Sequence, residues 1–276
     1  MQTWLIENET TIRLSFFVGI LLTMAILELI IPQRKLQFSK VTRWVNNLGL
    51  VVLNSILLRF LAPIMATGAA VIATEKSIGI FNLFELPYYL EIFLMVALLD
   101  FSIYLQHALV HALPLFWRLH RMHHADLDYD VTTGSRFHPI EIFISMGYKI
   151  TVVMVLGVRV EAVILFEILL NATAMFNHSN IRLPKRLDQV IRIFLVTPDM
   201  HRVHHSVIPK ETNSNFGFAL PWWDYLCGTY QKEPRHGQLG MTIGLEVLRE
   251  EKELTLPALL VQPFKSVKDQ YSLQKD

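Results

Sequence analysis

The sequence predicts an all-α integral membrane protein: a bundle of about four to five transmembrane helices with a histidine-rich helical cap on the cytoplasmic side. Three observations support this: the 276-residue chain is 52% hydrophobic and only 18% charged, five segments are long and apolar, and histidines gather in short runs. Soluble domains have roughly 25% charged residues. The net charge of +1 gives no reason to expect a nucleic-acid partner. Cys227 is the single cysteine, which excludes an internal disulfide and a thiolate metal cluster.

The first two predicted spans lie before residue 75. Residues 11–32, "TIRLSFFVGILLTMAILELIIP", are mostly apolar, and about 20 such residues suffice to cross a bilayer. This stretch is too long for a signal-peptide core and follows acidic rather than basic residues, so we expect a membrane anchor. Residues 46–74 predict a second span, which Arg59 and Pro63 interrupt.

Three further spans follow. Residues 86–113 predict one of them, and residues 139–157 and 160–177 predict a hairpin of two more, joined tightly around residues 157–159. A soluble protein with buried helices is the alternative, but five such segments rarely pack together without lipid.

Basic residues predict the orientation of the bundle. The loop between the first two spans is basic, whereas the opposite side offers the N-terminus, Lys76 and Arg159; the basic residues of the loop are Arg34, Lys35, Lys40 and Arg43. The positive-inside rule therefore places this loop in the cytoplasm. Counting spans then puts residues 114–138, and everything after residue 178, on the same side.

The remaining features concern organisation and location. No tandem repeat or linker divides the sequence, so we expect a single domain over residues 1–276. Residues 245–254, "LEVLREEKEL", predict a short surface helix. The ending "LQKD" is not a retrieval signal for the endoplasmic reticulum. Together with the compact chain, this favours a bacterial inner membrane over the endoplasmic reticulum.

Eight of the eleven histidines form three runs. His107 and His111 are four residues apart, which places both imidazoles on one face of a helix. "HRMHH" at residues 120–124 and "HRVHH" at residues 201–205 share the spacing H-x-x-H-H. Before the second of these runs, Thr197 and Pro198 predict a helix start.

The runs indicate metal binding. A single histidine in an apolar helix is usually a hydrogen-bonded core residue, but clustering eight without a ligand would bury unpaired imidazoles at a cost in free energy. Imidazole binds zinc, iron, copper and nickel, and a catalytic zinc usually takes three protein ligands, so eight or nine histidines predict two ions. No run contains a glutamate as H-E-x-x-H does. This favours oxygen activation at a di-iron centre over hydrolysis.

Several motifs around these runs carry a resemblance to a known family. They are "SRFHPIE" at residues 135–141, "FNHSNI" at 176–181, "TPDMHRVHHS" at 197–206 and "NFGFALPWWDYLCGTY" at 215–230. With the three histidine runs in order, the sequence resembles the fatty acid hydroxylase/sterol desaturase superfamily of membrane di-iron enzymes. The resemblance covers about residues 100–230 and implies a catalytic core of about residues 95–230.

The resemblance implies metal ligands. Those in the three runs are His107, His111, His120, His123, His124, His201, His204 and His205. His178 resembles a further ligand, and Glu167, Asn171 and Ala174 share its helical face. Ionisable groups in membrane segments are usually functional, so Glu167 and Asn171 are candidates for the site or its surroundings. Some branches of the superfamily have another histidine where Ala174 stands.

Two further residues are candidates near the metal site. His138 is a candidate ligand, but its place before Pro139 also fits a role in orienting the cap. Asp100 lies seven residues before His107. It is a candidate to accept an N–H from a ligand imidazole or to make a helix-packing hydrogen bond.

The resemblance implies a membrane-bound di-iron oxygenase that uses O2 to hydroxylate or desaturate an unactivated C–H bond of a lipid. The cofactor would be two iron ions, which zinc could replace in a purified sample. Electrons would come from a separate donor, such as a ferredoxin or cytochrome b5 with its reductase, since the sequence contains no fused haem, flavin or ferredoxin motif. The alternatives are a membrane zinc-dependent hydrolase using the same histidines and a metal transporter. Gathering of the runs at one membrane face disfavours the transporter.

Overall fold

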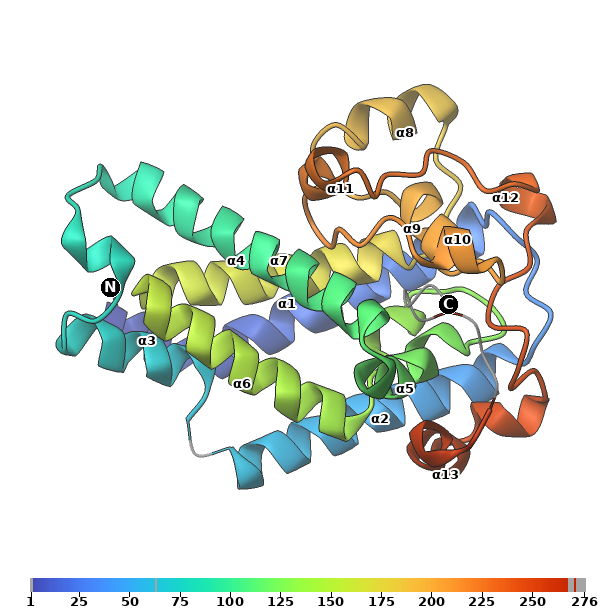
Figure 1. Cartoon of the computed structure of the whole chain (residues 1–276), viewed down its shortest axis with the longest axis horizontal. Coiled ribbons are helices and arrows are strands. Elements are labelled where there is room, and N and C mark those ends of the chain that lie inside the picture. Colours follow the sequence, from blue (N-terminus) through green and yellow to red (C-terminus); the bar gives the residue numbers. More distant parts are fainter. Residues whose placement is uncertain (1, 63, 268–270, 272–276) are drawn as a thin grey trace.

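The computed structural model describes residues 2–62, 64–267 and 271, and within them every regular element is a helix (Figure 1). Five segments are long and apolar enough to cross a membrane, which confirms the predicted all-α membrane bundle. They contain the long helices α1 (Gln2–Ile30), α2 (Lys40–Leu61), α4 (Tyr88–Ala112), α6 (Pro139–Leu156) and α7 (Val160–Asn177).

The outer helices present apolar side chains to the surroundings of the protein. Leu29 of α1 is 74% exposed and Phe60 of α2 is 80% exposed. Such exposure is costly in water and is expected for helices that face lipid tails. The exposed surface of α1 and α2 therefore fits a bilayer.

The second predicted span is divided into two helices. α2 continues through Arg59 and ends at Leu61, and the short helix α3 (Ala66–Glu75) follows. The break falls beside Pro63, which lies outside the described residues. Because the residue before a proline disfavours helical backbone, helices usually end at this point. The predicted interruption of this span is therefore confirmed beside Pro63, but not at Arg59, through which α2 continues without a break.

The hairpin between α6 and α7 forms where the sequence predicts it. Gly157 ends α6 with a φ of 73°, a left-handed conformation that favours glycine. A Cβ at Gly157 would lie 2.6 Å from the carbonyl oxygen of Ile78, so the chain after α3 packs directly on the hairpin. The 3-10 helix η1 (Ile80–Leu83) completes this end of the bundle.

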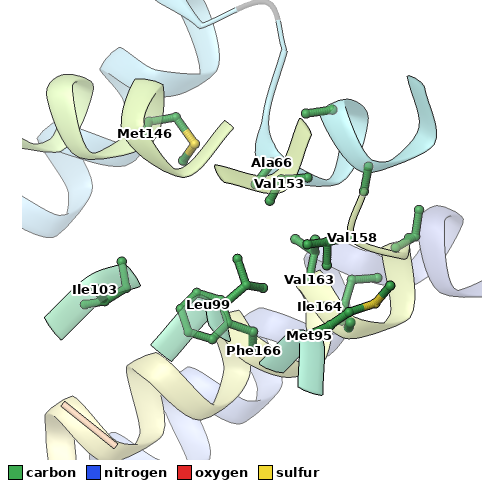
Figure 2. Close-up of a cluster of buried hydrophobic side chains, with 14 of the residues drawn as sticks. Ala66, Met95, Leu99, Ile103, Met146, Val153, Val158, Val163, Ile164 and Phe166 are labelled. Carbon is green, nitrogen blue, oxygen red and sulfur yellow. The ribbon is translucent and has the colours of Figure 1, made fainter. Parts of the chain in front are cut away.

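The hydrophobic core of the bundle lies between α3, α4, α6 and α7 (Figure 2). Met95 and Leu99 of α4 are fully buried there, beside Val153 of α6 and Val163 of α7. This core holds α4 and α7 together, and the C-terminal ends of both helices carry histidines toward the cap.

The cap consists of residues 113–138 and 178–267, and it gathers around one end of the long helices (Figure 1). It is built from short pieces: α5 (Pro114–His124), η2 (Thr133–Ser135), α8 (Lys185–Ile191), α9 (Pro198–His204), α10 (Pro209–Thr212), α11 (Trp222–Cys227), α12 (Gly237–Gly240), η3 (Glu251–Leu254), α13 (Leu256–Val261) and η4 (Gln262–Phe264). Residues 245–250 are not helical, so only the end of the predicted surface helix forms, as η3. The "LQKD" ending lies outside the described residues.

Buried charges attach the cap to α2. The guanidinium group of Arg43 donates two 2.8 Å hydrogen bonds to the carboxylate of Asp126 and also pairs with Asp130, and all three side chains are fully buried. Although burial favours the neutral acid, Arg43 and Arg136 hold the pKa of Asp126 well below its usual range. This arrangement fixes the loop that follows α5, and with it the position of the first H-x-x-H-H run.

Candidate metal centre

Nine histidines meet where the long helices join the cap, and they form two groups. We call them the five-histidine group (His107, His111, His120, His124 and His204) and the four-histidine group (His123, His178, His201 and His205). Within each group one ligand nitrogen from every histidine lies within 4.8 Å of all the others, and all nine side chains are buried. These are the same nine residues that the sequence singled out.

Four elements bring these residues together. His107 and His111 lie near the end of α4, and the chain turns at Leu113 into α5, whose last turn carries the first H-x-x-H-H run. The second run ends α9, where Thr197 caps the helix by accepting a hydrogen bond from the amide of Met200. His178 follows directly after α7.

Each H-x-x-H-H run contributes to both groups. His123 and His124 belong to different groups, and so do His204 and His205. Successive residues of a helix point about 100° apart, so each doublet directs its two imidazoles toward different groups. Each motif therefore links the two groups.

Facing nitrogens show that the five-histidine group fits a metal ion. The Nδ1 atoms of His107 and His204 lie 2.8 and 2.7 Å from the carbonyl oxygens of Phe216 and Ser214. A neutral ring that donates from Nδ1 has an unprotonated Nε2. Yet the two Nε2 atoms lie 3.0 Å apart. Two lone pairs at this distance repel, whereas two nitrogens bound to one ion at about 2.0–2.1 Å would be separated by roughly 2.9–3.4 Å.

The four-histidine group shows the same arrangement. His178 directs Nδ1 to the carbonyl oxygen of Ala174 at 2.7 Å. Its Nε2 atom lies 3.1 to 3.2 Å from the Nε2 atoms of His123, His201 and His205. One unprotonated nitrogen can accept one hydrogen bond but not three. A shared cation accounts for all three separations.

Burial favours the neutral, metal-binding form of these rings. It lowers the pKa of His178 to about 3 and holds the pKa of His204 and His205 well below the ordinary histidine value. Neutral imidazole is the form that ligates metals. The all-nitrogen donor set suits iron or zinc rather than calcium or magnesium.

The partners of the Nδ1 atoms include residues that the sequence did not indicate. His120 contacts Glu141 at 2.6 Å, and His111 contacts the side-chain oxygen of Asn213 at 3.2 Å. Such contacts fix the tautomer and orientation of ligand imidazoles. Glu141 is part of the quoted "SRFHPIE" motif, but the motif alone did not indicate that it contacts His120. Asn213 lies outside every quoted motif, so we know of no sequence signal that would have found it.

Close backbone packing also places the four-histidine group. Gly134 of η2 lies against the end of α7. A Cβ there would lie 2.8 Å from the carbonyl oxygen of Ala174 and 3.0 Å from Nδ1 of His178. Only glycine lets the cap approach His178 this closely without displacing it.

A cavity of about 320 Å³ reaches the five-histidine group from the membrane-spanning helices. His107 and His120 line its histidine end, and residues of α1, α2, α4, α6 and α7 form its walls. Its size falls in the range of small-molecule pockets. The cavity connects the lipid-facing bundle with the candidate metal centre.

The four other candidate residues lie around the histidine groups. Asp100 accepts hydrogen bonds from the amides of Ala219 and Leu220 and from Trp223, so it ties α4 to the cap. His138 accepts from the amide of Ile140 at the start of α6, and its Nε2 lies 3.2 Å from the carbonyl oxygen of Leu260, which fits the orienting role. Neither belongs to the two groups.

Glu167 and Asn171 line the cavity on the α7 face that the sequence predicted. Glu167 pairs with Lys149 and Arg13, and Asn171 donates to the carbonyl oxygen of Glu167. Both lie outside the two histidine groups.

The charged residues near the runs make contacts within the cap. Arg118 and Arg121 donate to backbone carbonyls of residues 262–265, and Arg202 pairs with Asp199 at 2.5 Å. Asp224 accepts from the amides of Phe216 and Gly217, which steadies the segment whose carbonyl orients His107.

Comparison with known proteins places this site in context. The fatty acid hydroxylase family model matches residues 92–229. An ornithine lipid hydroxylase of Rhizobium tropici is 28% identical over 178 residues, covering 64% of this chain and 51% of the relative. The human alkylglycerol monooxygenase is 26% identical over 172 residues, covering 59% and 36%. A Delta(7)-sterol 5(6)-desaturase of Eremothecium gossypii is 30% identical over 148 residues, covering 53% and 39%. The matches thus span about half or less of these relatives, and no solved structure matches the chain.

Proposed function

The chain belongs to the fatty acid hydroxylase family, and from this premise we propose that it is a membrane-bound di-iron oxygenase that hydroxylates or desaturates an unactivated C–H bond of a lipid. One observation carries the proposal: two buried histidine groups, with unprotonated nitrogens facing one another, lie beside a cavity walled by membrane-spanning helices. The reaction would use O2 and a separate electron donor, such as a ferredoxin or cytochrome b5 with its reductase.

The nine histidines would hold two iron ions, which supply the oxygen chemistry when bound. The protein holds the imidazoles in position through Phe216, Ser214, Glu141 and Asn213. The buried setting excludes bulk water from the reacting C–H bond. The cavity would admit the hydrocarbon part of the substrate from the bilayer to His107 and His120.

The lipid class of the substrate rests on two supports. The names of the relatives refer to an ornithine lipid, alkylglycerol and a sterol. The cavity opens among helices that are long and apolar enough to lie in a membrane. We further propose one domain over residues 1–276 with its catalytic core at about residues 95–230. The histidines would lie on the cytoplasmic side of a bacterial inner membrane.

Mass spectrometry of lipids from cells expressing the wild-type protein tests this proposal. We expect lipids that gain one oxygen atom or lose two hydrogens, only in aerobic, iron-supplied cells. His123→Ala and His204→Ala should abolish these products, and metal analysis of each purified variant should show less iron. A product that forms without O2 on the zinc-loaded protein would instead identify a hydrolase. Lipid oxidation retained in both variants would overturn the proposal.

A further inference from the structure

Polar residues form a stripe along α6, which is otherwise apolar. Glu141, Ser145 and Lys149 are spaced four residues apart, so they follow one side of the helix, and all three line the cavity. Glu167 and Asn171 of α7 line it as well. Buried polar groups without partners cost free energy. A cavity that held only hydrocarbon tails would therefore not be expected to have such a polar wall.

The far end of the stripe is a chain of charges within the spans. Lys149 donates to Glu167 at 2.6 Å, Glu167 lies 2.8 Å from Arg13, and Arg13 pairs with Glu9 at 2.6 Å. Two acids and two bases make this chain neutral. The Glu167 side chain is 2% exposed and that of Lys149 is 12% exposed. The Lys149–Glu167 pair is thus largely buried within the membrane-spanning helices, where ionisable groups are usually functional.

Lys149 has hydrogen-bonding capacity left over. Its ammonium group has three donors. Among the described residues, Glu167 is its one hydrogen-bond acceptor and its one ion-pair partner. If the cluster only held α1, α6 and α7 together, two donors of a nearly buried ammonium would lack a partner, which is costly. Lys149 instead lines the cavity, where an acceptor on a ligand would satisfy it.

Helix α6 carries both Glu141, which contacts the metal centre, and Lys149. Glu141 contacts His120, and Lys149 follows eight residues later on the same helix. At 1.5 Å per residue the two positions are about 12 Å apart along the axis. The cavity therefore has a hydrogen-bonding end at Lys149 and a histidine end at His107 and His120.

We propose that Lys149 binds an uncharged acceptor oxygen of the lipid substrate, such as a hydroxyl, ether or ester carbonyl oxygen. An uncharged group is favoured because the four-residue cluster is already neutral and a further acid there would have no cation of its own. The substrate is thus an oxygen-bearing lipid, and the C–H bond that is oxidised lies farther along the molecule, toward the histidine end of the cavity. This inference rests on the proposed function for its chemistry but not for its binding test.

Binding of three probes to the full-length protein in nanodiscs tests the inference. The probes are dodecan-1-ol, dodecane and dodecanoate, and affinity is obtained from ligand-dependent thermal stabilisation. We expect the wild type to bind the alcohol about tenfold or more tightly than the alkane, since one hydrogen bond to a charged group is at stake. Lys149→Met should remove this preference while leaving alkane affinity and iron content unchanged.

Two variants complete the design. Thr151→Ala is the matched control, because Thr151 is an exposed residue of α6 whose hydroxyl donates to the carbonyl oxygen of Gly147 on the same helix. This variant should bind the three probes as the wild type does. If Lys149→Met alone fails to fold, the double variant Lys149→Met/Glu167→Gln removes the base together with its acid partner. Equal wild-type affinities for alcohol and alkane, tighter binding of dodecanoate than of the alcohol, or an unchanged preference in both variants would overturn the inference.

The products of turnover separate this inference from the proposed function. In cells, we expect Lys149→Met to broaden the position of oxidation along the chain while the protein keeps its iron. A Lys149-dependent alcohol preference in a protein that oxidises no lipid would refute the proposed function and leave the binding site standing. Normal oxidation with no such preference would refute the binding site alone.

Discussion

The two histidine groups differ in how their imidazoles are held. In the five-histidine group, four of the five Nδ1 atoms have an acceptor: those of His107, His111, His120 and His204. In the four-histidine group only His178 has one among the described residues, whereas Nδ1 of His123, His201 and His205 is buried without a partner. Ring packing replaces hydrogen bonding there, as where His123 stacks on Phe137 with centroids 4.8 Å apart.

The difference predicts that the two groups would hold the two proposed metal ions unequally. Hydrogen-bonded imidazoles are held in one tautomer and orientation, and the five-histidine group is also the one that lines the cavity. Packed but unbonded rings can adjust their angle. We therefore expect the five-histidine group to bind its ion more tightly and to hold it in a more constant geometry.

The largest expected effect comes from removing one ligand from each group. His204→Ala and His205→Ala alter adjacent residues that belong to different groups. Each should lose about one bound ion per chain and reduce lipid oxidation by at least about a hundredfold, since loss of a mere supporting contact already costs roughly 10- to 100-fold. Metal analysis and product assays check this. His236→Ala, at an exposed position of the cap just before α12, is the control and should match the wild type. Loss of both ions in both variants would show that the groups do not bind independently.

Chelation tests the expected order of affinities directly. During titration with a chelator, the ion of the four-histidine group should leave first, at a roughly ten- to hundredfold lower chelator concentration than the ion of the five-histidine group. Hydrogen bonds to ligand imidazoles strengthen metal binding by about that factor. Ultraviolet and X-ray absorption spectra would follow the ligand set of the ion that remains. Thermal stability should fall in two steps, because metal binding stabilises the folded state. Simultaneous loss of both ions would contradict the expected difference in metal affinity between the two groups.

Glu141 provides a test confined to the five-histidine group. Glu141→Ala removes the acceptor of His120 and should weaken metal binding at that group by roughly tenfold or more. Glu141→Gln is the matched control, because its amide oxygen still accepts a hydrogen bond, so its loss should be smaller. Metal titration of both variants should leave the four-histidine group unchanged. An equal loss at the two groups would mean that Glu141 supports the whole cap instead.

The sequence predicted which histidines would meet, but not how they divide. The two H-x-x-H-H runs have identical spacing, so nothing in either run tells which member of the doublets His123–His124 and His204–His205 joins which group. That division depends on how α5 and α9 face each other, which is a property of the packed cap. The same holds for Glu141, since only the start of α6 brings it to His120.

The spans were more predictable than the attachments of the cap. Apolar length determines a membrane helix within one segment, and five spans were found in this way. By contrast, the pairing of Arg43 with Asp126 joins residues 83 positions apart. Asp100 illustrates the same limit, because it lies on α4 with His107 yet its hydrogen bonds go to residues 219–223.

The smallest expected effect is at Asn213. It tests how far the difference in metal affinity between the two histidine groups depends on weak contacts. Its side-chain oxygen lies 3.2 Å from Nδ1 of His111, longer than the other four Nδ1 contacts. Asn213→Ala should weaken metal binding at the five-histidine group by about three- to tenfold, the value of one neutral hydrogen bond of about 0.5–1.5 kcal/mol. Asn213→Asp, which keeps an acceptor oxygen, should restore most of the affinity. If Asn213→Ala costs as much as Glu141→Ala, then the charge on Glu141 adds nothing, and the number of Nδ1 acceptors alone distinguishes the two groups.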